Sequence, residues 1–474
     1  MLKKIIVKNW LLISILLVSA FLRLYRIPAY MEFLGDQGRD VEIIRDFLKN
    51  GNLFFIGPQT SIGNMYLGPF YYYLVAPFLL LANYSPVGPA IFIALLSVLT
   101  TYLIYFVSNK WFNKNTAYIS AFLYSISPVA IKYSNFSWNP NIMPLFALLF
   151  IYLMTEKRYL WASIAFAMCL NSHYLALILL PLAFIIWLKD YSKSSIKPTI
   201  LATFLFIASL IPQILFDIKH QGQNIGALIT FFTQRENSTG GTINLKVYKA
   251  LPIIPRLFNQ INTDLLAGKD PAFGIIVSII LFIGIIYLLI KHRNQKLIYS
   301  VLWYLIGLVG LGLYKQHIYS HYFGFLFPVV FILMGYFLSK IPKLLTILLL
   351  ILLTTFSLLQ NPFRWAPNKQ LDTTIRISQY IINDSQDQPF NYALLSKMGY
   401  AFSYYLSEDK NYFELNDKVT EQLYVVCVPF QIECNPINNP EWSVAAFGWA
   451  KIESETEIEG IKIFKLVHNP TGQE

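Results

Sequence analysis

A series of ten apolar runs constrains the fold of this chain more than any other feature of its sequence. A helix needs about 20 residues to cross the hydrocarbon core of a bilayer. The run over 160–188 is too long for one helix and is interrupted by the polar residues 171–174, so we divide it into two spans. About eleven transmembrane helices are therefore predicted. The ten runs lie at 10–27, 87–108, 116–133, 141–155, 160–188, 198–216, 273–290, 297–314, 321–338 and 343–360.

The composition excludes a water-soluble globule. Of the 474 residues, 55% are hydrophobic and only 13% are charged, which is typical of an α-helical polytopic membrane protein. The formal net charge is +11, but residues 361–474 carry 9 basic and 15 acidic side chains. The excess of cations therefore belongs to the membrane portion and indicates its topology, and we expect no nucleic-acid partner.

The charged loops predict which side of the membrane each connection occupies. Every second connection is basic, and these connections hold fifteen Lys and Arg residues against only Glu156 and Asp190. Because short cytoplasmic loops collect Lys and Arg, we predict a multi-pass plasma-membrane protein with these connections in the cytoplasm. The loop that contains Asp36, the other polar loops and residues 361–474 then share the extracytoplasmic side.

One further apolar segment could change the number of crossings and so the side of the membrane assigned to each loop. Counting residues 66–82 as a span would move Asp36 to the cytoplasm. The segment is short, carries Pro69 and Pro77 and contains three consecutive tyrosines at 71–73, which is typical of an interfacial helix. We therefore interpret it as a helix that lies on the outer leaflet.

Continuous apolar runs give way to a mixed sequence after residue 360. We therefore predict a transmembrane domain over residues 1–360 and a small extracytoplasmic α/β domain over 361–474. In the second domain, residues 371–383 have helical periodicity. The pattern predicts strands at 392–395, 423–428, 444–447 and 461–467. Cys427 and Cys434 are compatible with a disulfide on an oxidising face and equally with two free thiols.

The motif Gly35-Asp36-Gln37-Gly38-Arg39-Asp40 follows the first apolar span. Carboxylates at the edge of a bilayer are costly and usually functional. Asp36 stands where a helix over about 37–50 would begin, so it is either an N-cap or a general base that accepts a proton from an acceptor hydroxyl. Asp40 lies one turn later beside Arg39, where the simpler interpretation is a solvated ion pair.

Other polar side chains lie in the loops predicted to share this face. Lys132 is either a phosphate contact or a side chain that snorkels to the interface. His173 interrupts an apolar stretch, and a lone histidine is more often a packing residue. His317 and His321 are placed one helical turn apart, close to Lys315, which favours phosphate over metal binding. The sequence contains neither a zinc-ligand spacing nor a nucleotide-binding glycine loop.

The chain resembles the GT-C glycosyltransferases, in particular glycosyltransferase family 39, the branch of protein O-mannosyltransferases and aminoarabinose–lipid A transferases. The resemblance covers roughly residues 10–340 and is carried by the Asp36 motif, Gly68-Pro69-Phe70-Tyr71-Tyr72-Tyr73, the loop from Ser127-Pro128 to Pro144, and His321-Tyr322 running into Pro328.

This resemblance implies a polyprenyl-phosphate-linked sugar donor, transfer on the extracytoplasmic side and inversion at the anomeric carbon. It makes Asp36 the catalytic carboxylate. Substrate-binding roles are then expected for Arg39, Asp40, Lys132, Asn139, His173, Lys315, His317 and His321. The acceptor is a glycolipid, a cell-envelope glycan or a protein.

The chain departs from the family at two places. Many members carry a second acidic residue where this chain has Asn139, and a Lys-Pro pair where it has Gly68-Pro69. The loss of a second carboxylate argues against a tightly bound divalent metal, so we predict no metal site and no cofactor.

Two other functions are compatible with the pattern. A transporter or flippase of lipid-linked sugars would use Asp36, Arg39 and His173 as gates, although transporters place ionisable groups near the midplane and show internal repeats. An assembly or sensor protein would work through residues 361–474 and would not need Asp36. The charges gather in the outward loops and no repeat is visible, which favours the glycosyltransferase.

Overall fold

The computed structural model describes residues 2–60, 63–189, 191–233, 251–314, 317–396, 399–428 and 434–469. The chain divides into two compact units. The first, which we call the helical unit, contains Met1–Tyr25, Asn52–Ala82 and Gly88–Ala366. The second, which we call the mixed unit, contains Arg26–Gly51, Asn83–Val87 and Pro367–Glu474. Residues 26–51 and 83–87 thus group with the C-terminal segment, and a separate domain over 361–474 stays a prediction.

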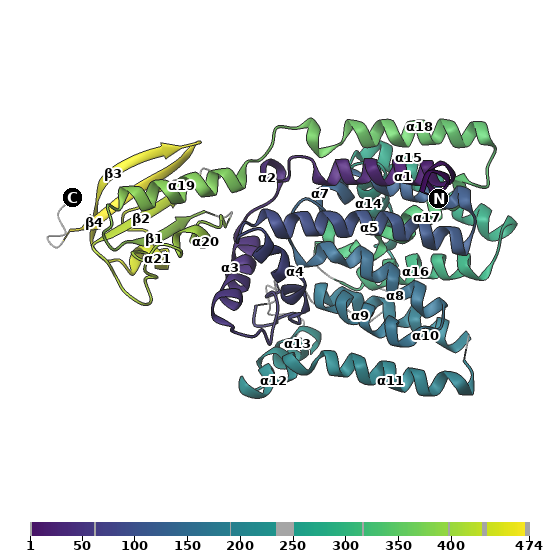
Figure 1. Cartoon of the computed structure of the whole chain (residues 1–474), viewed down its shortest axis with the longest axis horizontal. Coiled ribbons are helices and arrows are strands. Elements are labelled where there is room, and N and C mark those ends of the chain that lie inside the picture. Colours follow the sequence, from purple (N-terminus) through teal and green to yellow (C-terminus); the bar gives the residue numbers. More distant parts are fainter. Residues whose placement is uncertain are drawn as a thin grey trace. The chain divides into compact units, whose positions relative to one another are not determined.

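The helical unit is built from helices that run roughly parallel or antiparallel to one another (Figure 1). Its N-terminal half contains α1 (Leu2–Leu24), α4 (Phe70–Leu81), α5 (Val87–Trp111), α6 (Lys114–Ile126), α7 (Pro128–Lys132), η1 (Asn139–Ile142), α8 (Met143–Thr155), α9 (Tyr159–Ser172), η2 (Tyr174–Leu179) and α10 (Leu180–Lys189). The remainder contains α11 (Lys193–Ser209), α12 (Ile211–Lys219), α13 (Gln223–Thr233), α14 (Ile254–Leu266), α15 (Pro271–Lys291), α16 (Gln295–Gly312), η4 (Ser320–Leu326), α17 (Phe327–Leu338), α18 (Lys343–Leu359) and η5 (Pro362–Arg364).

The core of the helical unit is centred on α17, of which every residue is buried. A helix that is apolar on all sides is stable only when other helices surround it. Gly335 allows α17 to approach α6 closely, because a Cβ atom at this position would overlap the side chain of Ser120. Helix starts in this unit use side-chain caps, as where Asn294 accepts from the backbone N–H of Leu297 at 2.9 Å.

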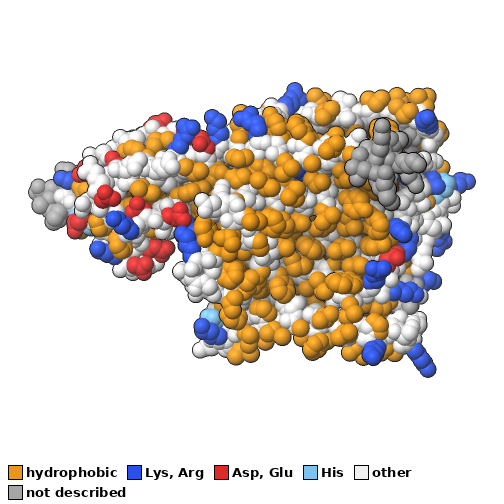
Figure 2. All heavy atoms as spheres, viewed as in Figure 1, with side chains coloured by type: hydrophobic (Ala, Val, Ile, Leu, Met, Phe, Trp, Pro, Cys, Tyr) orange, Lys and Arg blue, Asp and Glu red, His pale blue; other side chains and the backbone are white. Residues whose placement is uncertain are grey.

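Four described helices are long and apolar enough to cross a membrane, and α11 with α12, bent by 43°, adds a fifth. The four spans are Val87–Trp111, Pro271–Lys291, Gln295–Gly312 and Ser320–Leu338. Other apolar runs form shorter helices of 10–17 residues. The run over 160–188 is broken at His173, between α9 and η2, which confirms the predicted interruption. Hydrophobic side chains form a broad band over this unit, with Lys and Arg along its right-hand edge (Figure 2).

The mixed unit contains a four-stranded sheet that is covered on one face by α19 (Figure 1). The strand order is β1-β2-β4-β3, with β1 and β2 parallel and the other pairs antiparallel. Ile377 and Ile381 of α19 pack on Val426 and Ile463 of the sheet. The elements are α2 (Ile27–Tyr30), α3 (Gly35–Asn50), α19 (Gln370–Asp384), β1 (Asn391–Leu395), α20 (Ser403–Leu406), β2 (Gln422–Cys427), α21 (Trp442–Ala445), β3 (Ala450–Ile458) and β4 (Ile461–His468).

The predicted helix over 371–383 and three of the four predicted strands are confirmed. The strand predicted at 444–447 is wrong, because this apolar run lies in the short helix α21 and the turn after it. Strand β3 was not predicted, because its side chains are largely exposed and include one lysine and three glutamates, as an edge strand allows. Cys427 and Cys434 are joined by a disulfide, which decides between the two alternatives that the sequence left open.

Candidate active-site residues

The Asp36 motif forms the start of helix α3 in the mixed unit. The helix begins at Gly35, after an extended Leu34 whose backbone N–H donates to the side chain of Gln37 at 3.0 Å. It ends at Gly51, where the left-handed φ of 76° favours glycine. Asp36 therefore lies within the first turn, and the prediction that it is the N-cap is wrong. Its carboxylate is still favoured by the positive end of the helix dipole.

Arg39 links the two carboxylates of the motif. Its Nη1 lies 3.0 Å from Oδ1 of Asp36, and its Nε and Nη2 donate to Oδ1 of Asp40 at 3.1 and 2.8 Å. The Asp36 side chain is 51% exposed, whereas that of Asp40 is 4% exposed. The prediction of a solvated Arg39–Asp40 pair is thus wrong, since Asp40 is buried and fixes the arginine. Arg39 in turn orients the accessible carboxylate of Asp36.

The helical unit brings together two of the other predicted residues, His173 and His321. They lie with Trp138, Tyr319 and Tyr322 in a group that we call the aromatic–histidine cluster. The ring of His321 lies 4.5 Å from that of Trp138 and 4.5 Å from that of Tyr322. Tyr322 also contacts His173, with 5.2 Å between ring centroids. The exposed ring of Tyr319 stacks on His321 at 5.7 Å. Three loops distant in sequence thus meet at two histidines.

His173 is held in one orientation by the break between α9 and η2. Its Nδ1 accepts a hydrogen bond from the backbone N–H of Leu175 at 3.2 Å, so in the neutral ring the proton lies on Nε2. Burial lowers the pKa of His173 to about 4, so the ring is neutral at physiological pH. Asn139 supports the same turn, because its side-chain amide donates to the carbonyl oxygen of Ser172 at 2.7 Å. The buried Asn139 therefore acts on the backbone beside His173.

The remaining predicted residues are placed differently. His317 precedes η4 in an extended segment, so the prediction that it lies one helical turn before His321 is wrong. Its exposed ring contacts that of Tyr319 at 4.6 Å. Lys132 is exposed at the end of α7. Lys315 lies outside the described residues.

Gly68 lies against the side chain of Asn171. Many proteins of the family that the chain resembles carry a lysine at the position of Gly68. A Cβ atom on residue 68 would overlap the side-chain oxygen of Asn171. The same oxygen accepts from the backbone N–H of Phe70 at 3.3 Å, and the amide nitrogen donates to Ala167 at 2.8 Å. The side chain of Asn171 therefore fills the space beside residue 68 and fixes the start of α4.

Among the buried ionisable residues of the helical unit, Arg23 and Asp264 lie near the cluster in the chain or fold and were not predicted as site residues. Arg23 is fully buried and donates to Ser97 at 2.7 Å and to the carbonyl oxygen of Ser125 at 2.9 Å. Asp264, in α14, accepts from the hydroxyl of Ser320 at 2.6 Å, next to His321 in the chain. Burial raises the pKa of the Asp264 carboxyl. Each was inconspicuous in sequence because its partners lie far along the chain.

A pocket in the helical unit lies between these features. Its lining includes Tyr124, Tyr133, Asn141 and His321. Tyr124 also accepts a hydrogen bond from Arg23, and His321 belongs to the aromatic–histidine cluster, so the lining includes a neighbour of the arginine and a member of the cluster. Within the described ranges, no three His, Cys, Asp or Glu side chains come together in a way that would hold a metal ion.

Residues 67–216, about a third of the chain, match the family model described as dolichyl-phosphate-mannose-protein mannosyltransferase. This part of the chain is therefore similar to a family of membrane glycosyltransferases. The match includes Gly68-Pro69 and His173 but begins after the Asp36 motif. No curated protein matches the chain significantly in sequence.

Solved structures of similar fold include a bacterial and an archaeal membrane protein. ArnT from Cupriavidus metallidurans bound to undecaprenyl phosphate aligns with a TM-score of 0.63 and 10% identity over 98% of this chain and 99% of that protein. Its apo state gives 0.60 and 11%, over 98% and 100%. The oligosaccharyltransferase AglB from Archaeoglobus fulgidus, in complex with an inhibitory peptide and a dolichol-phosphate, gives 0.51 and 12%, over 89% and 70%. The chain therefore shares the fold of these multi-pass membrane proteins.

Proposed function

We propose that this protein is a glycosyltransferase that moves a sugar from a polyprenyl-phosphate-linked donor to an acceptor hydroxyl, with inversion at the anomeric carbon. The observation that carries the proposal is the family match over residues 67–216, whose description names a dolichyl-phosphate sugar as donor. The undecaprenyl phosphate bound to ArnT and the dolichol-phosphate bound to AglB give further support for a lipid phosphate as the leaving group. The acceptor is a glycolipid, a cell-envelope glycan or a protein.

Asp36 is the base in this proposal. Its exposed carboxylate accepts the proton of the acceptor hydroxyl while the oxygen attacks the anomeric carbon. The bond between that carbon and the phosphate oxygen breaks, and polyprenyl phosphate leaves with the bonding electrons. A lipid phosphate is a competent leaving group, so one oriented base and hydrogen-bond donors to the phosphate are sufficient. Arg39, fixed by Asp40, keeps the carboxylate of Asp36 oriented.

We assign substrate contacts to the aromatic–histidine cluster. Ring faces of Trp138 and Tyr319 suit the apolar face of a sugar, and His173 and His321 have ring N–H groups that can donate to hydroxyl or phosphate oxygens. Asn139 holds the turn that carries His173. Exposed Lys132 and His317, together with Lys315, supply positive charge or donors for the phosphate. No metal takes part in this scheme.

We further propose about eleven crossings, with the Asp36 loop and the mixed unit on the extracytoplasmic side of the plasma membrane. The broad apolar band over the helical unit and the cations at its edge support such an arrangement (Figure 2). Helices shorter than 18 residues cross in this arrangement together with the turns that flank them, as for α9 and α10 on either side of His173.

The proposal is tested by transfer of labelled sugar in sealed membrane vesicles of known orientation, supplied with a panel of polyprenyl-phosphate sugars. Wild type is compared with Asp36→Asn and with Asp46→Asn, which removes the same charge from an exposed position on the same helix. We expect transfer by wild type and by Asp46→Asn, and loss of transfer in Asp36→Asn at equal protein levels. Full transfer by Asp36→Asn would refute the role of Asp36, and wild-type uptake of donor without transfer would favour a transporter.

A further inference from the structure

We propose that the C-terminal segment 399–408 positions the helix that carries Asp36. This inference rests on the proposed function, in which Asp36 is the base. Residues 399–408 include α20 and belong to the mixed unit together with α3, although more than 350 residues of chain separate the two. Two groups of contacts carry the inference: a close backbone approach at the first turn of α3, and a buried arginine further along the same helix.

The first turn of α3 lies against the backbone of residues 399–401. A Cβ atom built on Gly38 would overlap the Cβ atom of Ala401, and one on Gly35 would lie 3.3 Å from the carbonyl oxygen of Gly399. Leu34 and Tyr400 also form an antiparallel β-bridge. Gly35 and Gly38 are three residues apart and share one face of the helix. Asp36 lies between them in sequence and stays half-exposed, so the contact fixes the turn without covering the carboxylate.

Arg45 fixes the second half of α3 to the same segment. Its Nη1 donates to the carbonyl oxygen of Tyr404 at 2.7 Å, and its Nη2 donates to the hydroxyl of Ser407 at 2.8 Å. Glu408 lies 3.2 Å from Nη1. The guanidinium also lies 4.3 Å from the centroid of the Tyr404 ring. Only 7% of the Arg45 side chain is exposed, so these charge-assisted contacts are largely shielded from water.

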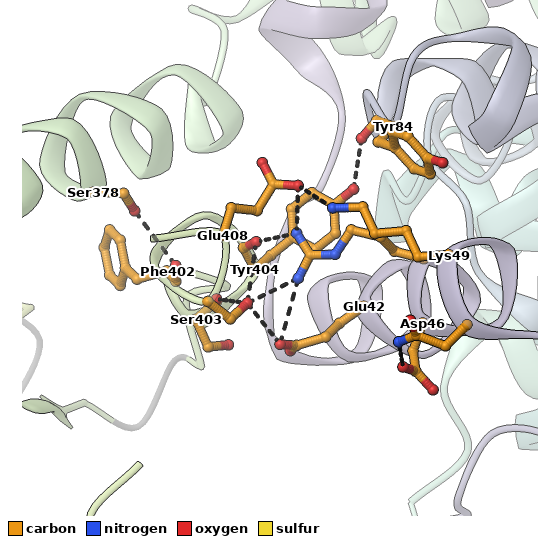
Figure 3. A network of polar contacts seen from close by, with 12 residues as sticks. Glu42, Asp46, Lys49, Tyr84, Ser378, Phe402, Ser403, Tyr404 and Glu408 are labelled. Atoms are coloured by element: carbon orange, nitrogen blue, oxygen red, sulfur yellow. Dashed lines mark hydrogen bonds and ion pairs between the residues drawn. The ribbon is translucent and has the colours of Figure 1, made fainter. Parts of the chain in front are cut away.

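Tyr404 extends the contact to a third piece of the chain. Its hydroxyl donates to the carbonyl oxygen of Tyr84 at 2.6 Å, and Lys49 of α3 lies over the ring of Tyr84 (Figure 3). Ser378 of α19 donates to the carbonyl oxygen of Phe402 at 3.4 Å, which joins α20 to the helix that covers the sheet. The sheet, α19 and α20 therefore form a base on which α3 is held at both ends.

The expected consequence is on the chemical step. A base must be held in place relative to the proton that it removes, and a displacement of about 1 Å can lower a rate by about 100-fold. If residues 399–408 only stabilised the fold, changes in them would not affect the rate constant of the folded protein. If residues 399–408 position α3, disturbing their contact with α3 affects kcat more than the KM of the donor. We therefore classify Gly38, Ala401 and Arg45 as positioning residues.

The test uses the full-length protein and the pair Gly38→Ala and Ala401→Gly, singly and together. Alanine has a higher helix propensity than glycine, so Gly38→Ala does not weaken α3 by itself. The matched control is Gly226→Ala, since Gly226 is also helical and a Cβ atom there would meet open space. The readouts are kcat, the KM of the donor, and hydrogen exchange of residues 35–50, which does not depend on activity.

We expect Gly38→Ala to lower kcat by about 10- to 100-fold, with little change in KM and with faster exchange in α3. Adding Ala401→Gly should restore kcat and exchange, and Gly226→Ala should match wild type. Unchanged kcat in Gly38→Ala, or a loss that Ala401→Gly does not recover, would overturn the positioning role.

Asp36→Asn measured in parallel separates the two claims. An inactive Asp36→Asn beside a fully active Gly38→Ala would leave the proposed function standing and refute only the positioning role. Full activity in Asp36→Asn would refute Asp36 as the base, and the positioning role with it.

Discussion

The guanidinium of Arg23 lies over the ring of Tyr124, 5.1 Å from its centroid, and donates to the carbonyl oxygen of the same residue at 3.1 Å. It also donates to the carbonyl oxygen of Ser125. Both carbonyls belong to the last turn of α6, where backbone donors become scarce, and that of Tyr124 also accepts from the backbone N–H of Ser127 at 3.4 Å. Arg23 thus supplies buried donors at the negative end of the α6 dipole, where a cation is favoured.

Replacing Arg23 with methionine should therefore destabilise the helical unit. Each buried carbonyl left without a donor costs about 1–3 kcal/mol. We expect a lower unfolding temperature in detergent, with a much smaller effect for Lys110→Met, whose side chain is exposed at the end of α5. Equal unfolding temperatures for Arg23→Met and wild type would show that the carbonyls find other partners.

Gly68 and Asn171 should behave as a coupled pair. We expect Gly68→Ala to cost about 1–3 kcal/mol, as overpacking of a filled site does, because its Cβ would displace the Asn171 side chain. In Asn171→Ala the space is free, so the double variant should be no less stable than Asn171→Ala alone. Chemical or thermal unfolding of the four proteins measures the coupling. Additive losses would contradict the packing described above.

Removing Arg45 should weaken the attachment of α3 to α20. Its loss leaves buried acceptors, including the carbonyl oxygen of Tyr404, without their charged donor. A buried carbonyl left without its donor costs about 1–3 kcal/mol. Lys49→Met is the control, since Lys49 reaches the same Glu408 from an exposed position and such exposed pairs contribute about 0–1 kcal/mol. Proteolysis of the mixed unit should accelerate in Arg45→Met and not in Lys49→Met, and equal rates would refute the difference.

His173 should make stability depend on pH. Its pKa is about 4 in the folded protein, below the ordinary value of 6.5, because burial disfavours the charged ring. As the pH falls, this histidine therefore binds a proton in the unfolded chain before it does so in the folded protein. The free energy of unfolding decreases as the pH falls from 6.5 towards 4. His173→Asn keeps an acceptor for the N–H of Leu175 but does not titrate, so its unfolding temperature should fall less over this range. Parallel curves for the two proteins would contradict this assignment.

The features that sequence predicted best depend on local pattern. The break at His173 was predictable because four polar residues interrupt an apolar run, and α19 because its apolar residues recur with helical spacing. The edge strand β3 was missed because its sequence, KIESETEI within Ala450–Ile458, is polar and largely exposed, although it pairs with β4 on both sides of a register shift between Ile452 and Ser454. Residues 444–447 were assigned wrongly because a short apolar run does not distinguish a strand from a helical turn.

The site depends more on contacts between distant residues. Arg23 stands at the end of an apolar span, where an arginine ordinarily marks the membrane interface, and only the fold reveals its carbonyl partners. The sequence gives no sign of the contacts of Gly35 and Gly38 with Gly399 and Ala401, because these residues lie far apart along the chain. Asp40 was read as solvated because its burial is set by tertiary packing, which sequence spacing does not show.

The most direct test of Asp36 as the base of a sugar-transfer reaction is a single-turnover measurement on the purified full-length protein in lipid nanodiscs. A polyprenyl-phosphate sugar that is active in the vesicle panel is supplied with its acceptor, and sugar incorporation and release of polyprenyl phosphate are followed together. The account predicts equal amounts of both products with wild type and Asp46→Asn, and loss of both with Asp36→Asn. Equal rates of transfer by wild type and Asp36→Asn would contradict it.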